Sequence, residues 1–192
     1  MRMTKFLLIL LSFSIVTACG SPIEENMSRK VGDFSATTQN GESIHLPEDL
    51  HGNYWIIDFF FTSCKTVCPP MTGNLSRLQS RLEKENLDTK IISISVDPSH
   101  DQPKVLKKFS EQYQADYSRW SFLTGYSFED VKELSIKSFQ SPVSNIENSD
   151  QVAHGTRFFL VTPEGKVIKR YKGTKAEEID QIIEDLKKLK QS

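Results

Sequence analysis

Two cysteines four positions apart, Cys64 and Cys68, are the residues of this chain best suited to chemistry. They follow an apolar run, residues 54–61, whose aromatic and β-branched side chains predict a buried strand. Pro69 and Pro70 come next and suit the first turn of a helix, where a missing N–H costs nothing. We therefore expect both sulfurs at a strand-to-helix junction, near the positive end of a helix dipole, which favours thiolate over thiol.

A thiolate is both a nucleophile and a metal ligand, so this spacing leaves three chemistries open. One is a metal site, because residues four apart on a helical turn share one face and can grip a single ion. Another is a redox-active pair, in which one sulfur attacks a disulfide and the other resolves the product. The third is a structural disulfide, although a loop this short gains little stability from cross-linking.

Composition indicates one soluble globular domain. The chain has 192 residues, of which 38% are hydrophobic and 26% charged, which is enough for a real core. Its formal net charge is -1, so nothing suggests binding to nucleic acid.

The first residues have the pattern of an export signal. Arg2 and Lys5 precede an apolar run, residues 6–16, that is too short to span a bilayer. The sequence Val16-Thr17-Ala18-Cys19 resembles the lipobox of bacterial lipoproteins, in which the cysteine is lipidated, although many lipoboxes carry leucine at the position of Val16. An ordinary signal peptide with a chance cysteine is the alternative, and a transmembrane anchor is disfavoured.

The lipobox predicts three segments at the start of the chain. Residues 1–18 are expected to be a signal peptide, and residues 19–30 a flexible tether from a lipidated Cys19. More than one acyl chain on Cys19 would anchor the protein to the extracytoplasmic face of the cell membrane. Cys64 and Cys68 then remain as one pair in an oxidising compartment.

Residues 31–190 are expected to form a single domain. Asn40-Gly41 is a strong hairpin signal between strands at residues 34–38 and 43–46. The elements expected after this hairpin are strand 54–61, helix 69–86, strand 90–96, helix 101–114, strand 120–123, a helix around 128–134, a polar loop 139–153, strands 157–161 and 166–171, and a helix over 179–189. This order predicts an α/β sandwich with a mixed sheet.

At this point a family resemblance emerges. Residues 62–69, Thr-Ser-Cys-Lys-Thr-Val-Cys-Pro, resemble the copper motif of the Sco (SenC) family, thioredoxin-like proteins that help to assemble cytochrome c oxidase. Three later segments resemble further family landmarks in the same order: Ile94-Ser95-Val96-Asp97-Pro98 with Asp101, Phe122-Leu123-Thr124-Gly125, and Val152-Ala153-His154-Gly155-Thr156 followed by Pro163-Glu164-Gly165. The likeness covers about residues 31–189.

The resemblance implies a thioredoxin-like mixed-sheet sandwich with an N-terminal β-hairpin extension, and a copper site made by Cys64, Cys68 and His154. Two thiolates favour Cu(I), and an added imidazole makes Cu(II) acceptable as well. Structural zinc normally takes four protein ligands, and the sequence offers no convincing fourth. For His154, a plain surface histidine of the polar loop is the alternative. His45, His51 and His100 are expected at the surface or in caps.

The roles of several residues near the proposed copper ligands remain open between two interpretations. Lys65-Thr66 replaces the Pro-Asp of many family members, and Ser63 replaces a histidine; Lys65 favours thiolate but opposes a bound cation. Asp97 and Asp101 are candidates for supporting the copper ligands, although a strand-end turn and a helix start require them equally. Met71 is expected in the core, with a weak thioether bond to Cu(I) as the alternative.

Three functions remain in competition. A membrane-tethered metallochaperone would pass copper to the Cu(A) centre of cytochrome c oxidase subunit II. A thiol–disulfide oxidoreductase, with Cys64 and Cys68 as its redox-active pair and an external thiol reductant, would keep the Cu(A) cysteines reduced. A copper or redox sensor would use the same ligands. The absence of proline from residues 153–156, where thioredoxin-like reductases usually carry a cis-proline, favours metal, and no peroxiredoxin pattern P-x-x-x-T-x-x-C surrounds either cysteine.

Overall fold

The computed structural model describes residues 21–147, 149 and 151–191. The expected signal peptide over residues 1–18 and the lipidation site Cys19 lie outside these described residues. Within the described part of the chain, no helix combines the length and the apolar character that crossing a bilayer requires.

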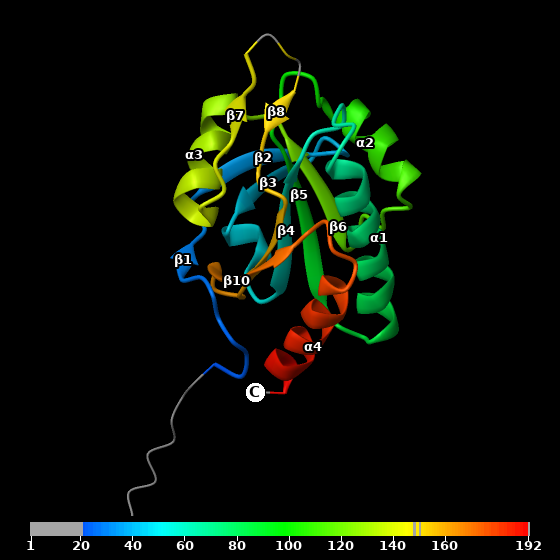
Figure 1. Cartoon of the computed structure of the whole chain (residues 1–192), viewed down its shortest axis with the longest axis vertical. Coiled ribbons are helices and arrows are strands. Elements are labelled where there is room, and N and C mark those ends of the chain that lie inside the picture. Colours follow the sequence, from blue (N-terminus) through cyan, green and yellow to red (C-terminus); the bar gives the residue numbers. More distant parts are fainter. Residues whose placement is uncertain (1–20, 148, 150, 192) are drawn as a thin grey trace, which may run out of the picture.

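A mixed sheet of eight strands, in the order β1-β10-β9-β4-β5-β6-β2-β3, forms the centre of the molecule (Figure 1). Its strands are β1 Arg29–Lys30, β2 Phe34–Thr38, β3 Ser43–Leu46, β4 Tyr54–Phe60, β5 Thr89–Ser95, β6 Trp120–Thr124, β9 Arg157–Val161 and β10 Lys166–Lys172. The pairs β4–β5 and β5–β6 are parallel, and the remaining pairs are antiparallel. β4 lies at the centre with both faces covered, which explains its continuous apolar sequence.

In the described part of the chain, four α-helices cover the two faces of this sheet: α1 Cys68–Lys84, α2 Pro103–Gln112, α3 Phe128–Phe139 and α4 Glu178–Lys190. On one face, Phe139 of α3 packs edge-on against Phe59 of β4, with ring centroids 5.3 Å apart. On the other face, Phe109 of α2 stacks on Phe60 at 5.4 Å. α1 and α4 lie on the α2 side and are joined by an ion pair between Arg81 and Asp180 (Figure 1).

The expected mixed-sheet α/β sandwich is therefore confirmed. The β2–β3 hairpin is also present, and Gly41 adopts φ 84° in its turn, a conformation that glycine tolerates at no steric cost. A short 3₁₀ helix, η1 Glu48–Leu50, follows this hairpin. Because α1 begins at Cys68, only one of the two cysteines belongs to the helix, and Cys64 lies in the preceding loop.

One element departs from the polar loop expected over residues 139–153. Two short strands, β7 Ser144–Asn145 and β8 Val152–Ala153, pair there as an antiparallel hairpin. Strands of two residues carry too little alternation of apolar and polar side chains to be recognised in a sequence. This hairpin matters because its second strand leads directly into His154.

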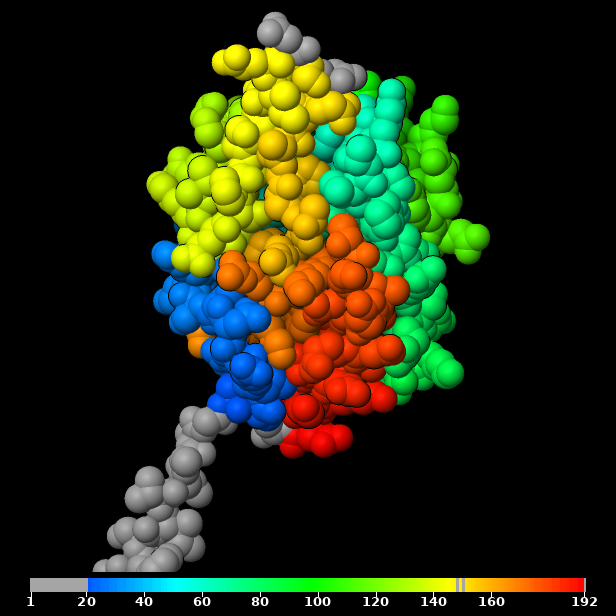
Figure 2. Space-filling model, viewed as in Figure 1, coloured from blue at the N-terminus to red at the C-terminus, as the bar shows by residue number. Residues whose placement is uncertain are grey.

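Residues 23–30 differ from the flexible tether that the sequence predicts. Ile23 and Met27 are buried, and the Asn26 side chain bonds both the N–H and the carbonyl of Arg170. β1 then pairs with β10 and covers what would otherwise be an open sheet edge. We call residues 23–30 the N-terminal strap; Figure 2 shows it in blue, lying against the surface beside the orange and red C-terminal segments.

The strap makes a contribution to stability that can be measured. We expect the double variant Ile23→Ala/Met27→Ala to lower the free energy of unfolding by about 2–4 kcal/mol, because both side chains leave cavities against the sheet. Urea denaturation followed by circular dichroism measures this loss. The exposed Glu24→Ala change serves as the control and should stay within about 0.5 kcal/mol of the unmodified protein. If the double variant were as stable as the unmodified protein, residues 23–30 would be a flexible tether, as the sequence predicts.

Candidate metal centre

Three side chains from two distant segments converge at one end of the sheet. Cys64 and Cys68 come from the loop after β4 and the first residue of α1, and His154 follows β8. Their ligand atoms, two sulfurs and one imidazole nitrogen, all lie within 4.8 Å of one another. Cys68 Sγ and His154 Nε2 are 3.3 Å apart. No other group of three histidine, cysteine or acidic side chains with this geometry occurs among the described residues.

The loop between β4 and α1 aims both sulfurs at the same point. The N–H of Cys64 donates to the carbonyl of Phe61, which closes the turn after the strand. The N–H of Cys68 then donates to Cys64 Sγ at 3.4 Å, so Cys64 caps the N-terminus of α1. Both cysteines are free thiols and buried, with 8% of Cys64 and 1% of Cys68 exposed. The predicted strand-to-helix junction and the first-turn prolines are confirmed.

His154 is held in the orientation that a metal ligand requires. Its Nδ1 donates to the carbonyl of Gly155 at 3.0 Å, which leaves the lone pair of Nε2 directed toward Cys68. Its ring also meets Phe61 edge-on at 5.7 Å. Burial lowers the pKa of His154, so the imidazole is neutral and able to ligate at pH 7.

Gly155, the residue after His154, lies close to the segment that follows α3. A Cβ at Gly155 would collide with the Oγ of Ser141, a buried residue just after α3. The backbone of residues 154–155 therefore passes very close to this segment. This close approach fixes the backbone position from which the His154 side chain extends.

The two thiols differ in acidity. Burial raises the pKa of Cys64, but hydrogen bonds from Cys68 and from backbone N–H groups outweigh that effect and lower it overall. Burial raises the pKa of Cys68 strongly, and its hydrogen bond to Cys64 raises it further. Of the two thiols, Cys64 therefore loses its proton more readily, and Cys68 keeps its proton more strongly.

The two aspartates singled out in the sequence behave differently. Asp101 is fully buried and accepts hydrogen bonds from Thr62 N, Thr62 Oγ1 and Ser95 Oγ, so it ties the cysteine loop to the end of β5. Burial raises the pKa of Asp101. Asp97 closes the turn after β5: its carbonyl accepts from the N–H of Asp101, and its carboxylate accepts from Ser99 Oγ.

A further carboxylate on the helix side of β4 escaped the sequence analysis. Asp58 is 1% exposed, and its charge helps to raise the pKa of Cys68. Its Oδ1 accepts from Ser93 Oγ at 2.6 Å, whereas its Oδ2 has no partner among the described residues. Burial raises the pKa of Asp58 to about 7. The signal was present, because Asp58 is the single charged residue inside the apolar run over residues 54–61.

The remaining candidates lie in the core or at the surface, outside the ligand cluster. Met71 is fully buried in the core. His45, His51 and His100 are exposed and do not belong to the cluster, and Lys65 is exposed beside it.

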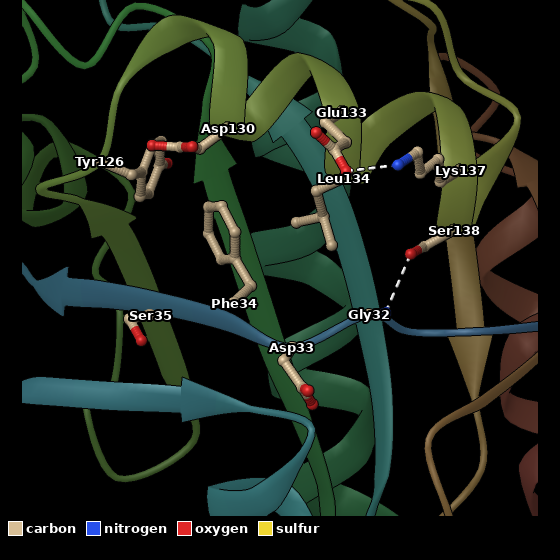
Figure 3. Close-up of a pocket in the computed structure, with 10 residues that line it drawn as sticks. All are labelled: Gly32, Asp33, Phe34, Ser35, Tyr126, Asp130, Glu133, Leu134, Lys137 and Ser138. Carbon is tan, nitrogen blue, oxygen red and sulfur yellow. Dashed lines mark hydrogen bonds and ion pairs between the residues drawn. The ribbon is translucent and has the colours of Figure 1, made fainter.

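A sizeable hollow lies elsewhere, between β2 and α3, with a volume of about 390 Å³ (Figure 3). Its lining mixes polar and apolar side chains, and its charged groups are partly neutralised because Lys137 pairs with Glu133. Ser138 accepts a hydrogen bond from the N–H of Gly32 across one end of it. It contains none of the three converging ligands, so it is separate from the candidate metal centre.

Fold and site together define a thioredoxin-like protein with a dithiol and a facing histidine. The family model for SCO1/SenC matches residues 23–191. The chain therefore belongs to the SCO1/SenC family, as the resemblance of its motifs implied. It is 44% identical over 188 residues to the SCO1 protein homolog of Bacillus subtilis (strain 168), an alignment that covers 97% of each chain.

Solved structures agree with this assignment. A SCO1/SenC family lipoprotein from Bacillus anthracis str. Ames has a TM-score of 0.81 at 42% identity, covering 86% of this chain and 98% of that one. BsSco, a Sco-family cytochrome c oxidase assembly protein with a disulfide switch, has a TM-score of 0.78 at 45% identity, covering 86% and 95%. Yeast Sco1 with copper bound has a TM-score of 0.66 at 26% identity, covering 83% and 89%. The expected thioredoxin-like fold is confirmed.

Asp58 gives the protein a distinctive dependence of stability on pH. Its pKa is about 7 in the folded state, against an ordinary value of 3.8 once the chain unfolds, so between these values only the folded state keeps the proton. Stability from this group is therefore complete below pH ~4 and falls by about 1.4 kcal/mol per pH unit until pH ~7. We expect Asp58→Asn to remove this fall, which makes the variant more stable than the unmodified protein at pH 8, by at most ~4 kcal/mol.

Denaturation in urea at several pH values, from about 4 to about 8, measures this difference. The exposed Asp88→Asn change is the control and should leave the pH profile unchanged. Parallel profiles for Asp58→Asn and the unmodified protein would contradict the raised pKa of Asp58.

Proposed function

We propose that this protein is a copper metallochaperone for the assembly of cytochrome c oxidase, and that Cys64, Cys68 and His154 hold a single copper ion. The observation that carries the proposal is the convergence of two sulfurs and one imidazole nitrogen within 4.8 Å. Copper is the cargo of this protein, loaded and then given away.

The donor set fits copper better than other common ions. Two thiolates and an imidazole suit Cu(I), and the nitrogen also accommodates Cu(II). The neutral imidazole presents an unprotonated Nε2, and the lowered pKa of Cys64 makes its thiolate easier to form. Cys68 keeps its proton in the metal-free site, so an ion that binds this sulfur releases that proton. Copper loading is therefore expected to weaken in acid.

The acceptor we propose is the Cu(A) centre of cytochrome c oxidase subunit II, reached by exchange of ligands between thiols. Support comes from the family: BsSco is a cytochrome c oxidase assembly protein, and yeast Sco1 binds copper. Lys65, which with Thr66 stands where many family members have Pro-Asp, is exposed beside the site and does not belong to the ligand cluster.

We also propose that a lipidated Cys19 anchors the protein to the extracytoplasmic face of the cell membrane, after removal of residues 1–18. The support is the lipobox at residues 16–19 and the similarity to a Bacillus anthracis lipoprotein. Residues 23–30 pack on the domain, so the free part of the tether would be only a few residues long. Such a short tether would keep the domain close to the membrane surface.

A second function, reduction of the acceptor's disulfide, is favoured by the unequal acidity of the two thiols. The Cys64 thiolate would attack one sulfur of the acceptor disulfide and release the other as a thiolate. Cys68 would then lose its proton and attack Cys64, which frees the second acceptor sulfur and leaves a Cys64–Cys68 disulfide. Two electrons pass to the acceptor, and an external thiol reductant restores the dithiol. BsSco contains a disulfide switch, which supports this chemistry in the family.

Copper titration of the reduced domain tests the main proposal. We expect one ion per chain and a sulfur-to-copper charge-transfer absorption on addition of Cu(II). In His154→Ala the affinity should fall at least about tenfold, because one of three ligands is lost. Isothermal calorimetry and absorption spectroscopy give the two readouts.

His45→Ala is the matched control, since His45 is exposed, with its ring bonded to Ser35 and its backbone N–H to Asp49, away from the cluster. It should bind copper as the unmodified protein does. Equal binding by His154→Ala would remove the imidazole from the site and favour the reductase function.

A further inference from the structure

A groove of about 300 Å³ opens directly at the more exposed sulfur. It runs between the loop that carries Cys64 and the helix α2, and its lining includes Pro69, Phe109 and Tyr113 as well as Cys64 itself. The other half of the metal cluster, Cys68 and His154, does not line it. A molecule lying in this groove therefore reaches Cys64 first.

The floor of this groove is apolar and preformed. Phe109 stacks on the buried ring of Phe60 at 5.4 Å and contacts Tyr113 at 5.1 Å. Both Phe109 and Tyr113 remain half-buried, so one surface of each aromatic side chain is available to a ligand. The end of α2 is fastened to α1, because Ser76 Oγ donates to the carbonyl of Tyr113 at 2.9 Å. A rigid floor of this kind can bind an apolar side chain without first being ordered.

The rim of the groove is basic. Lys108 lines it, Lys104 lies one helical turn earlier on the same side of α2, and Lys107 and Lys65 are exposed nearby. None of these four lysines has an ion-pair partner among the residues that the structure describes, whereas six other lysines do. α2 carries a single acidic residue, Glu111. The positive charge around Cys64 is thus available to a partner.

We propose that this groove, which we call the α2 groove, docks a cysteine-bearing acidic segment of the protein partner. The segment lies along α2 with its carboxylates against Lys104 and Lys108, an apolar side chain over Phe109 and Tyr113, and its sulfur beside Cys64 Sγ. This inference rests on the proposed function, because both copper delivery and disulfide reduction need the acceptor sulfur at Cys64. It adds the chemistry by which the acceptor is recognised.

Attraction between opposite charges raises the rate of encounter and fixes the orientation of the docked segment. Its effect falls with ionic strength, because these lysines are exposed. An acidic acceptor should therefore react faster than a basic one, and the difference should shrink in salt.

The test uses Cys68→Ser protein, which traps the first reaction at Cys64. Three peptides carry one cysteine beside a leucine, with flanking glutamates, glutamines or lysines, and each is activated as a mixed disulfide with thionitrobenzoate. The Cys64 thiolate attacks the peptide sulfur, forms a Cys64–peptide disulfide and expels thionitrobenzoate, whose absorption gives the rate. We expect the glutamate peptide to react at least about tenfold faster than the lysine peptide at about 20 mM salt, where screening is weak, and the ratio to approach one in molar salt.

Two double variants separate docking from net charge. Lys104→Glu/Lys108→Glu should abolish or invert the preference. Lys84→Glu/Lys188→Glu makes the same change in net charge at exposed positions, in α4 and at the far end of α1, and should keep the preference. Equal rates for all three peptides, or a preference that survives the α2 changes, overturns the proposal.

Failure of this proposal is distinguishable from failure of the proposed function. The peptide rates are measured without copper, and Lys104→Glu/Lys108→Glu in the chain with both cysteines should still bind one copper ion. Vesicles containing phosphatidylserine test the alternative that the α2 groove binds an anionic lipid surface. Binding to these vesicles that depends on Lys104 and Lys108, with no preference among peptides, would assign the groove to lipid and overturn the proposal.

Discussion

The contact between Cys68 Sγ and His154 Nε2, at 3.3 Å, joins residues 86 positions apart, and the candidate site depends on it. Both residues are held in position for this contact by the surrounding structure. Cys68 is the first residue of α1, and His154 is placed by β8, by the hydrogen bond from its Nδ1 to Gly155 and by the close approach of Gly155 to Ser141. A ligand set assembled by rigid elements loses little conformational entropy when an ion binds. Cys64 completes the set from a loop that Asp101 fastens to β5 through Thr62.

Charge is distributed unevenly around these sulfurs. Two buried carboxylates, Asp58 and Asp101, lie on the inner side, while the lysines of α2 and Lys65 are exposed on the outer side. Burial raises the pKa of both inner carboxyl groups, and an ionised Asp58 would oppose the thiolate of Cys68. The metal-free site can therefore hold one negative sulfur but resists a second. A cation that arrives between the sulfurs removes this resistance, because its charge stabilises both thiolates.

Most of the fold could be predicted from the sequence, and the family resemblance implied the three residues that converge in the candidate site. The apolar runs of β4 and β5, the Asn40-Gly41 turn and the prolines after Cys68 each act through local rules, and the order of the elements then leaves few topologies. The β7–β8 hairpin could not be predicted, because two-residue strands leave no periodic pattern. The strap over residues 23–30 was missed for another reason: Asn26 holds it through its side-chain amide, and a polar residue in a polar segment gives no sign of such a contact. The role of Asp101 in supporting the cysteine loop could not be predicted either. It depends on tertiary contacts with Thr62 and Ser95, which the spacing of residues in the sequence does not reveal.

Copper delivery and disulfide reduction, which the sequence leaves in competition, share one geometric requirement. In both, an acceptor sulfur has to approach a sulfur of this protein, and Cys64 is the more exposed of the two and the one that lines the α2 groove. Cys68 is covered on the same side by Cys64 and on the other by His154. Under the proposed function, an incoming thiol therefore displaces Cys64 before it meets the buried pair of Cys68 and His154. The same approach without copper leads to a Cys64 mixed disulfide, so the presence or absence of the ion, and not a different binding mode, decides which reaction follows.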